Sequence, residues 1–297
     1  MRRILIGFDG SSHGDDALAL GLALRAALGD AAEATVAIAY KPVIPKDSSG
    51  TESDYQARLR HEAEQQLARA RELAPELPAA AFRAVRGSAA SALHRLAQES
   101  GADAIVVGTS HRSGLGRVWA GSATEQVLQG APCAVAVAPL GYAQLPPERR
   151  RLRRIGVAYD GSTEAKGALR AAVALARAAG ARVAPIAVAD VHVPTGAIFG
   201  YEQYVDAVRE LVALELREAG EEVAGAADVD LVAREGDPAH ELAAAADDVD
   251  LLVAGSRGHG PVRRVLLGSV SARLVREARS PLLVLPRSAL AAEGAEG

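Results

Sequence analysis

The residues between positions 255 and 271, rich in glycine, serine and arginine, are the stretch of this sequence best suited to binding chemistry. An apolar segment of buried-strand type, 250–254, precedes them, and a helical pattern that ends before Pro281 follows. Glycines permit sharp turns and let a ligand approach the backbone, and the first N–H groups of a helix attract anions. With Ser269 expected as the helix cap and cationic arginines nearby, this stretch is typical of a phosphate-binding loop.

The spacing of this stretch occurs twice in the chain. In the first copy Gly108 follows an apolar segment, and nine residues separate His111 from Gly121. In the second copy nine residues separate Gly258 from Gly268. A single glycine pair would indicate only a turn, but two copies at one spacing, each behind an apolar segment, favour a shared binding function.

Composition restricts the classes of protein to consider. The chain has 297 residues, enough for two ordinary domains, with 49% hydrophobic and 24% charged residues, as in soluble globular proteins. A net charge of −4 argues against a nucleic-acid partner. The single cysteine, Cys133, excludes an intrachain disulfide and a cysteine metal cluster. With no predicted signal peptide and no apolar run of membrane length, we expect a cytoplasmic protein without a membrane partner.

The second half of the chain repeats the first. Residues 155–162 match residues 4–11, and in each half short apolar segments alternate with helical patterns. We predict strands at 4–8, 35–40, 81–86, 104–107, 134–138, 155–159, 182–189, 230–233, 251–254 and 282–285. This alternation predicts an α/β fold with two parallel sheets flanked by helices. The expected domains span residues 1–139 and 154–287, with a linker at 140–153 and a flexible tail at 288–297.

One aspartate follows the first strand of each half, Asp9 in the first and Asp160 in the second. Ligands of parallel sheets lie beyond the carboxyl ends of the strands, so each aspartate should face the glycine loop behind the fourth strand. The alternative is that both aspartates only close a turn. The sequence lacks a Gly-x4-Gly-Lys-(Ser/Thr) loop, a dinucleotide fingerprint and a serine elbow, which argues against the enzyme classes that use them.

Over nearly its whole length the chain resembles a tandem universal stress protein of the ATP-binding subclass. It carries that family's pattern Gly-x2-Gly-x9-Gly-(Ser/Thr) in full at Gly255, Gly258, Gly268 and Ser269. The resemblance implies two Rossmann-like nucleotide-binding domains, each a five-stranded parallel sheet of order 3-2-1-4-5. The first half departs from the pattern because His111 stands where the second glycine is expected.

The resemblance also implies how a nucleotide is held. The adenine would lie near the ends of the first two strands, at Gly7, Asp9 and Ala39 in the first half and at Ala158, Asp160 and Val188 in the second. Ribose and phosphates would contact Gly108, Thr109, Gly121 and Ser122 in the first half, and Gly255, Ser256, Arg257, Gly258, Gly260, Arg264, Gly268, Ser269, Val270 and Ser271 in the second. No direct metal ligand set is implied, although Mg²⁺ bound with ATP would lie near Asp9 and Asp160.

The function implied is that of an ATP-binding sensor or regulator in a stress response, with at most slow hydrolysis; AMP and ADP are alternative working ligands. The rival hypotheses are a weak ATP hydrolase or adenylyl-transfer enzyme, and a scaffold that binds no nucleotide. The resemblance further implies that the fifth strands, 134–137 and 282–285, pair within one chain as a pseudo-dimer, because apolar edge strands require cover. A homodimer of whole chains is a further option.

Overall fold

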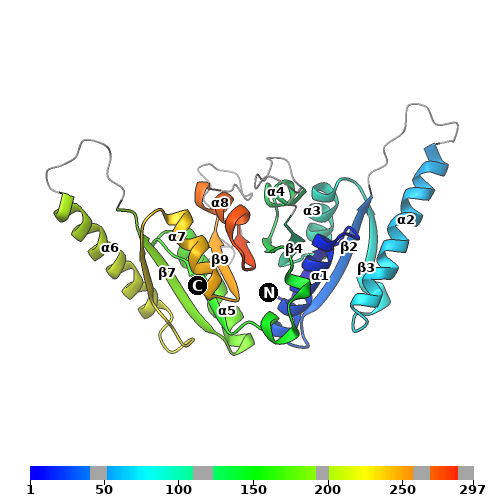
Figure 1. Ribbon diagram of the computed structural model, residues 1–297. Coiled ribbons are helices and arrows are strands. Elements are labelled where there is room, and N and C mark those ends of the chain that lie inside the picture. The colour runs from blue at the N-terminus through cyan, green and yellow to red at the C-terminus, as the bar shows by residue number, and fades with distance from the viewer. Residues whose placement is uncertain (41–51, 110–122, 192–200, 257–267, 287–297) are drawn as a thin grey trace. The chain divides into compact units, whose positions relative to one another are not determined.

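The computed structural model describes residues 1–40, 52–109, 123–191, 201–256 and 268–286, with the backbone alone for residues 52–56. The chain divides into two compact units, Met1–Arg150 and Arg151–Gly297, which are considered separately below (Figure 1). In the described ranges no helix combines the length and the apolar character needed to cross a membrane.

The first unit contains one parallel sheet whose strands lie in the order β3-β2-β1-β4-β5. Its strands are β1 (Arg3–Gly7), β2 (Glu33–Tyr40), β3 (Phe82–Arg86), β4 (Ala104–Gly108) and β5 (Ala134–Ala138). Its α-helices are α1 (Ser12–Leu28), α2 (Glu52–Leu73), α3 (Ala89–Ser100) and α4 (Ala123–Leu128). Short 3-10 helices span Ala79–Ala81, Tyr142–Gln144 and Pro147–Arg150.

The second unit repeats this topology, with strand order β8-β7-β6-β9-β10. Its strands are β6 (Arg154–Ala158), β7 (Arg182–Ala189), β8 (Val232–Glu235), β9 (Leu251–Gly255) and β10 (Leu282–Leu285). Its α-helices are α5 (Thr163–Ala179), α6 (Tyr201–Glu222), α7 (Pro238–Ala245) and α8 (Ser269–Glu277), with a 3-10 helix at Ala246–Asp248. The predicted tandem α/β fold with sheets of order 3-2-1-4-5 is confirmed.

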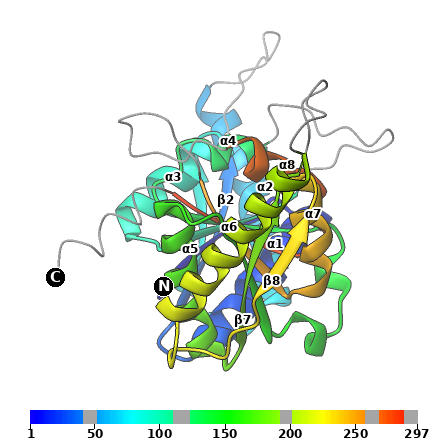
Figure 2. The ribbon, with the colours of Figure 1, turned by 90° about the vertical axis from the view of Figure 1, so that its left-hand side faces the viewer.

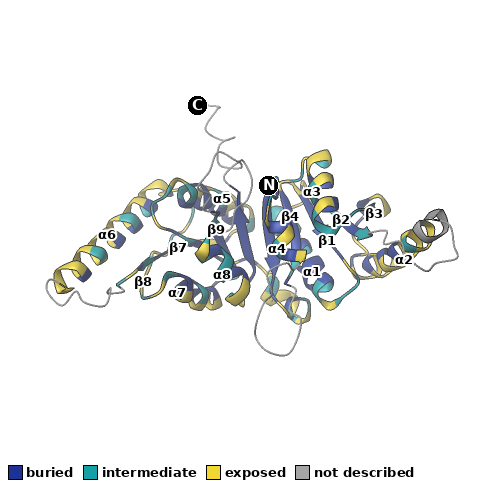
Figure 3. Cartoon of the chain, turned by 90° about the horizontal axis from the view of Figure 1, so that it is seen from above, coloured by how far each residue is buried: buried dark blue, intermediate teal, exposed yellow. Residues whose placement is uncertain are grey.

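Helices cover both faces of each sheet. In the second unit α5 and α6 lie on one face and α7 and α8 on the other (Figure 3). This distribution follows from right-handed crossovers, since the connections run outward from the first strand in opposite directions. The central strand β1 is buried on both faces, and Ile4, Leu5 and Ile6 are at most 2% exposed. Because β1 is parallel to β2 and β4, the carboxyl ends of all three strands lie at one edge of the sheet. The predicted site residues lie at this edge.

One strand lies two residues later than predicted. The expected strand 230–233 is β8, Val232–Glu235, and proline in β7 explains the shift. Val183 exchanges hydrogen bonds with Asp228 and Asp230 on the β8 side, at 2.8 and 2.9 Å. Pro185, two residues further along, faces the same side and has no N–H to donate. Regular pairing with β8 consequently begins only at Ile186, opposite Val232.

The segment that follows β5 folds back onto α1. Asp16 of α1 is 1% exposed, and its carboxylate accepts hydrogen bonds from the N–H groups of Gly141, at 3.0 Å, and Ala143, at 2.8 Å. Tyr142 between them is 3% exposed. Residues 141–143 of the segment expected as a linker are therefore packed within the first unit, while the exact domain boundaries stay a prediction.

Candidate functional site

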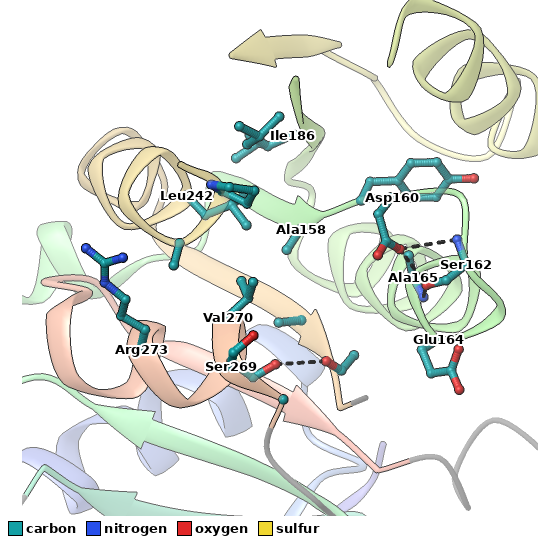
Figure 4. A pocket seen from close by; sticks show the side chains of 18 of the residues that line it. Ala158, Asp160, Ser162, Glu164, Ala165, Ile186, Leu242, Ser269, Val270 and Arg273 are labelled. Carbon is teal, nitrogen blue, oxygen red and sulfur yellow. Dashed lines mark hydrogen bonds between the residues drawn. The ribbon is translucent and has the colours of Figure 1, made fainter. Parts of the chain in front are cut away.

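A cavity of about 550 Å³ opens at the carboxyl ends of β6, β7 and β9 in the second unit (Figure 4). The first turns of α5, α7 and α8 complete its walls. Eight residues predicted from the sequence line it: Ala158, Asp160, Val188, Gly255, Gly268, Ser269, Val270 and Ser271. The structure thus brings together the end of the first strand, the end of the second strand and the start of the last helix, as the resemblance implies.

Asp160 closes a turn and also lines this cavity. Its Oδ1 accepts hydrogen bonds from the backbone N–H, at 3.2 Å, and the hydroxyl of Ser162. The Ser162 hydroxyl in turn accepts from Ala165 N at 3.2 Å and caps α5. In the first unit Asp9 and Ser11 repeat this arrangement, at 3.0 and 2.6 Å. The turn-closing role is therefore present in both units, and each exposed carboxylate still borders its cavity.

The start of α8 differs from the prediction by one residue. Gly268, not Ser269, is the N-cap, because Ala272 N donates the first helical hydrogen bond to Gly268 O at 2.8 Å. The Ser271 hydroxyl donates to Gly255 O at 3.1 Å, which fixes this first turn against the end of β9. No side chain caps the helix in the described part of the chain, so its first N–H groups are available to an anion.

The first glycine of each motif is required by packing. A Cβ on Gly108 would lie 2.1 Å from the carbonyl oxygen of His13, and a Cβ on Gly255 would lie 2.9 Å from Cβ of Glu164. Each glycine thus lets the N-terminus of the first helix of its unit rest on the end of the fourth strand. This contact accounts for the recurrence of the glycine in both units without a ligand.

Thr109 and Ser256, which follow these glycines, lie outside the cavity walls. They are 8% and 1% exposed, and neither hydroxyl has a hydrogen-bond partner among the described residues. Their N–H groups continue the hydrogen bonding of the sheet: Thr109 N donates to Ala138 O at 3.0 Å and Ser256 N donates to Leu285 O at 2.9 Å. A binding role for these two hydroxyls therefore stays a prediction.

The matching cavity of the first unit holds only about 130 Å³. Gly7, Asp9, Ala39 and Gly108 line it, so the predicted residues do converge. The space is smaller because Leu93 of α3 leans onto the end of β1: a Cβ on Gly7 would lie 2.9 Å from Leu93 Cδ1. In the second unit the methyl group of Ala158 stands at the position of Gly7.

Two charged residues that line the larger cavity were not predicted from the sequence. Arg273 of α8 and Asp237, the cap of α7, form an ion pair at 2.8 Å. Arg273 lies four residues after Ser269, one helical turn away on the same face, and that spacing was the available signal. It is the one basic side chain among the described wall residues, against the carboxylates of Asp160, Glu164, Asp190 and Asp237.

Burial and neighbouring carboxylates raise the pKa of two groups beside the cavity. The pKa of the Glu215 carboxyl is raised by burial and by the neighbouring charges of Asp160 and Glu218. Burial, followed by the carboxylates of α6 and Asp160, raises the pKa of Tyr159, whose hydroxyl has no described partner. The described end of the cavity near Asp160 is thus electronegative.

Six predicted binding residues lie outside the described residues: Gly121, Ser122, Arg257, Gly258, Gly260 and Arg264. His111, which replaces a glycine of the motif, lies outside them as well. Among the residues that are described, no group of three or more histidine, cysteine, aspartate or glutamate side chains is arranged to hold a metal ion.

Two solved structures that are similar to nearly the whole chain share its fold. A universal stress protein from Archaeoglobus fulgidus DSM 4304 is 20% identical, with 95% of each chain covered and a TM-score of 0.65. A functionally unknown protein from Pseudomonas aeruginosa PAO1 is 17% identical over 99% of this chain and 95% of its own, with a TM-score of 0.61. A universal stress protein in complex with cAMP covers 46% of this chain at 26% identity, with a TM-score of 0.33.

A search of curated proteins finds no match. The model of the universal stress protein family, however, matches the chain twice, at residues 1–139 and 151–286. These two matches fall one in each compact unit and together cover most of the sequence. The chain therefore belongs to the universal stress protein family and contains two copies of its domain.

Proposed function

We propose that the second unit binds an adenine nucleotide and that the chain acts as a nucleotide-dependent regulator in a stress response. The observation that carries this proposal is the cavity of about 550 Å³ among the predicted residues. Ligand pockets have volumes of about 300–1,000 Å³, so this cavity suits a nucleotide whereas the 130 Å³ cavity of the first unit is too small. The second unit is thus the principal binding site.

The walls of the cavity suit the separate parts of a nucleotide. The phosphates would lie at the uncapped start of α8, where N–H groups and the helix dipole favour negative charge. The carboxylate of Asp160, which lines the cavity wall, would accept hydrogen bonds from ribose hydroxyls. The base would pack on Ile186 and Leu242 and meet the backbone at Val188.

A magnesium ion would enter with the nucleotide. The described residues offer no preformed metal cluster, and Mg²⁺ is commonly held by one or two carboxylates together with substrate phosphates. As an alternative to contact with the ribose, Asp160 at the cavity wall can serve as such a carboxylate. This arrangement predicts that Mg²⁺ strengthens the binding of ATP more than the binding of AMP.

Regulation is favoured over dedicated catalysis. The only cysteine, Cys133, is 8% exposed, and burial raises the pKa of its thiol to about 12, so the thiol is protonated and inert at neutral pH. Turnover of ATP with Mg²⁺ at about 1 s⁻¹, within the usual enzyme range, would instead favour the hydrolase hypothesis. We place the regulator in the cytoplasm, in keeping with its composition.

Calorimetric titration with ATP, ADP, AMP and cAMP tests the proposal on the intact chain. Ser269→Pro removes one N–H donor at the first position of α8, where proline is tolerated. Hydrogen bonds to charged groups contribute about 1.5–3 kcal/mol, so the affinity for ATP should fall roughly 10- to 150-fold. Ser269→Ala, which also loses the hydroxyl but keeps the N–H, should retain most of the affinity.

The outcomes separate the hypotheses. One strong site that Ser269→Pro weakens and Ser269→Ala spares supports binding at α8. Equal affinities of the two variants would show that this N–H does not contact the ligand. An absence of binding by all four nucleotides, together with native mass spectra that show no retained nucleotide, would favour the scaffold hypothesis.

A further inference from the structure

Arg273 forms a small charge network at the cavity wall of the second unit. Its Nη1 donates to Asp237 at 2.8 Å and its Nε donates to Glu277 at 2.8 Å. One guanidinium between two carboxylates leaves the group with a net negative charge, so it will not attract the phosphates of a nucleotide. The start of α8 serves the phosphates instead. The one basic side chain among the described wall residues is therefore available to another part of the ligand.

The pair of Asp237 and Arg273 keeps unused hydrogen-bonding capacity. Oδ1 of Asp237 accepts from His240 N at 2.9 Å, as the cap of α7, and from Arg273. Within the ranges that the structure describes, Oδ2 of Asp237 and Nη2 of Arg273 make no further hydrogen bond. The Arg273 and Asp237 side chains are 39% and 50% exposed, and both line the cavity. This wall thus offers one acceptor and one donor group together.

The pair lies on the side of the cavity where the base is expected. Gly236 N donates to Ala189 O at 2.9 Å, which ties the start of α7 to the end of β7. Val188, whose backbone is expected to meet the base, directly precedes Ala189. Figure 2 shows α7 on the side of β8 away from α6, and Figure 4 shows Arg273 extending from α8 toward α7, across the cavity from Asp160. The pair therefore borders the space for the base rather than the space for the ribose.

One edge of adenine matches this donor and acceptor. The 6-amino group of adenine donates and the adjacent N7 accepts, whereas guanine and hypoxanthine present two acceptors there, O6 and N7. The carboxylate of Asp237 can accept from the amino group while Arg273 donates to N7. An oxo group in the same place would face the carboxylate and be repelled. The edge of adenine that contains N1 stays available to the backbone at Val188.

We propose that Asp237 and Arg273 are specificity-determining residues, which select adenine over purines that carry an oxo group at carbon 6. This selection rests on the proposed function, because it concerns the same nucleotide site. Phosphate contacts are the same for every nucleotide triphosphate, so a charge network that binds the base edge decides which base is accepted. A well-formed pair of contacts to a base edge discriminates by roughly 5- to 150-fold, and we expect a selectivity of this order.

Calorimetric titration of the intact chain with ATP and inosine triphosphate tests the proposal through Asp237→Asn. Asparagine is also a good N-cap, and its amide oxygen should accept the bonds from His240 and Arg273. The NH₂ group then replaces Oδ2, where it opposes the amino group of adenine and suits the oxo group of hypoxanthine. The preference for ATP over inosine triphosphate should fall by roughly 5- to 150-fold. Hypoxanthine also differs from adenine at N1, but this difference is common to parent and variant and cancels in the comparison.

Two further variants separate the roles of the two residues. Glu277→Gln keeps an acceptor for Nε of Arg273 and leaves Asp237 in place, so this matched control should keep the preference of the parent. Arg273→Ala should weaken the binding of ATP but not that of 7-deaza-ATP, in which a C–H group replaces N7.

The outcomes distinguish the selection of the base from the binding of a nucleotide. A parent that binds ATP, with an Asp237→Asn variant that keeps the same preference, would overturn the selection and leave the nucleotide site in place. Equal losses for ATP and inosine triphosphate in Asp237→Asn would also overturn it, since they would reflect only the cap of α7. Equal losses for ATP and 7-deaza-ATP in Arg273→Ala would overturn the contact with N7. A parent that binds neither triphosphate would overturn the proposed function and the selection together.

Discussion

The two units have the same strands and helices, yet their cavities differ fourfold in volume, about 130 against 550 Å³. The difference arises where α3 or α7 approaches the end of the first strand. Leu93 fills the space above Gly7, whereas the methyl group of Ala158 occupies the corresponding position in the second unit. A leucine lies over the end of the first strand in one unit and a methyl group stands there in the other, while the fold is the same.

The units also carry reversed charges on one structural contact. In the first unit Asp15 of α1 pairs with Arg69 of α2, and in the second Lys166 of α5 pairs with Glu218 of α6. Exposed ion pairs contribute only about 0–1 kcal/mol, so either polarity supports the same helix packing. The scaffold tolerates such exchanges, while the cavities define what each unit can bind.

The largest effect is expected from filling the second cavity. Ala158→Phe would place a ring where the base and ribose are expected, and ATP binding by the second unit should fall by at least about 100-fold, since overpacking a site costs about 1–3 kcal/mol or more. Ala158→Ser, which is nearly the same size as the parent residue, is the control. Calorimetry that shows equal affinity for both variants would place the nucleotide elsewhere.

A stability difference between the units is expected from Asp16. Asp16→Asn replaces one of the two accepting oxygens by an NH₂ group. This donor would face the N–H of Gly141 or Ala143, which then lacks an acceptor. Leaving a buried donor unsatisfied costs about 1–3 kcal/mol, and denaturant unfolding of the first unit should show a loss of this size. Asp30→Asn, at an exposed position after α1, should unfold like the parent. A similar loss in both variants would contradict a special role for Asp16.

A smaller effect on stability is expected at the last strand. Pro281 O and Leu285 O accept bonds from β9, so residues 281, 283 and 285 face β9 and Val284 faces the opposite edge. Val284→Pro therefore removes a donor only from the edge that is predicted to pair with the other unit, whereas Leu283→Pro breaks the ladder with β9. Small-angle scattering should show a larger radius for Val284→Pro with the second unit folded. A radius equal to that of the parent would rule out this pairing.

The repeat made most of the fold predictable from the sequence. Two copies of one apolar pattern, with an aspartate after the first strand and a glycine after the fourth, were sufficient for the α/β fold and for the edge that holds the cavity. The strand order came from the resemblance to universal stress proteins. Local hydrogen bonding could not be predicted from the sequence. The sequence did not reveal that Pro185 delays β8 or that Gly268 rather than Ser269 caps α8, because both depend on contacts with neighbouring strands.

The sequence also did not predict the relative sizes of the two cavities. Both units have a leucine at the matching position, Leu93 and Leu242, and only packing distances show that Leu93 lies over Gly7. The charged pair of Asp237 and Arg273 was missed for a similar reason, since the two residues come from different helices. Side-chain partners that are distant in the chain require the structure.

Hydrogen exchange with and without ATP tests the central claim, that the second unit holds the nucleotide at the start of α8, most directly. The amides of residues 268–271 should exchange more slowly when ATP is present, because phosphate oxygens accept their hydrogen bonds. The corresponding residues of the first unit, 121–124, should change less. Slowing that is equal or greater at 121–124, or no slowing at 268–271, would contradict the account.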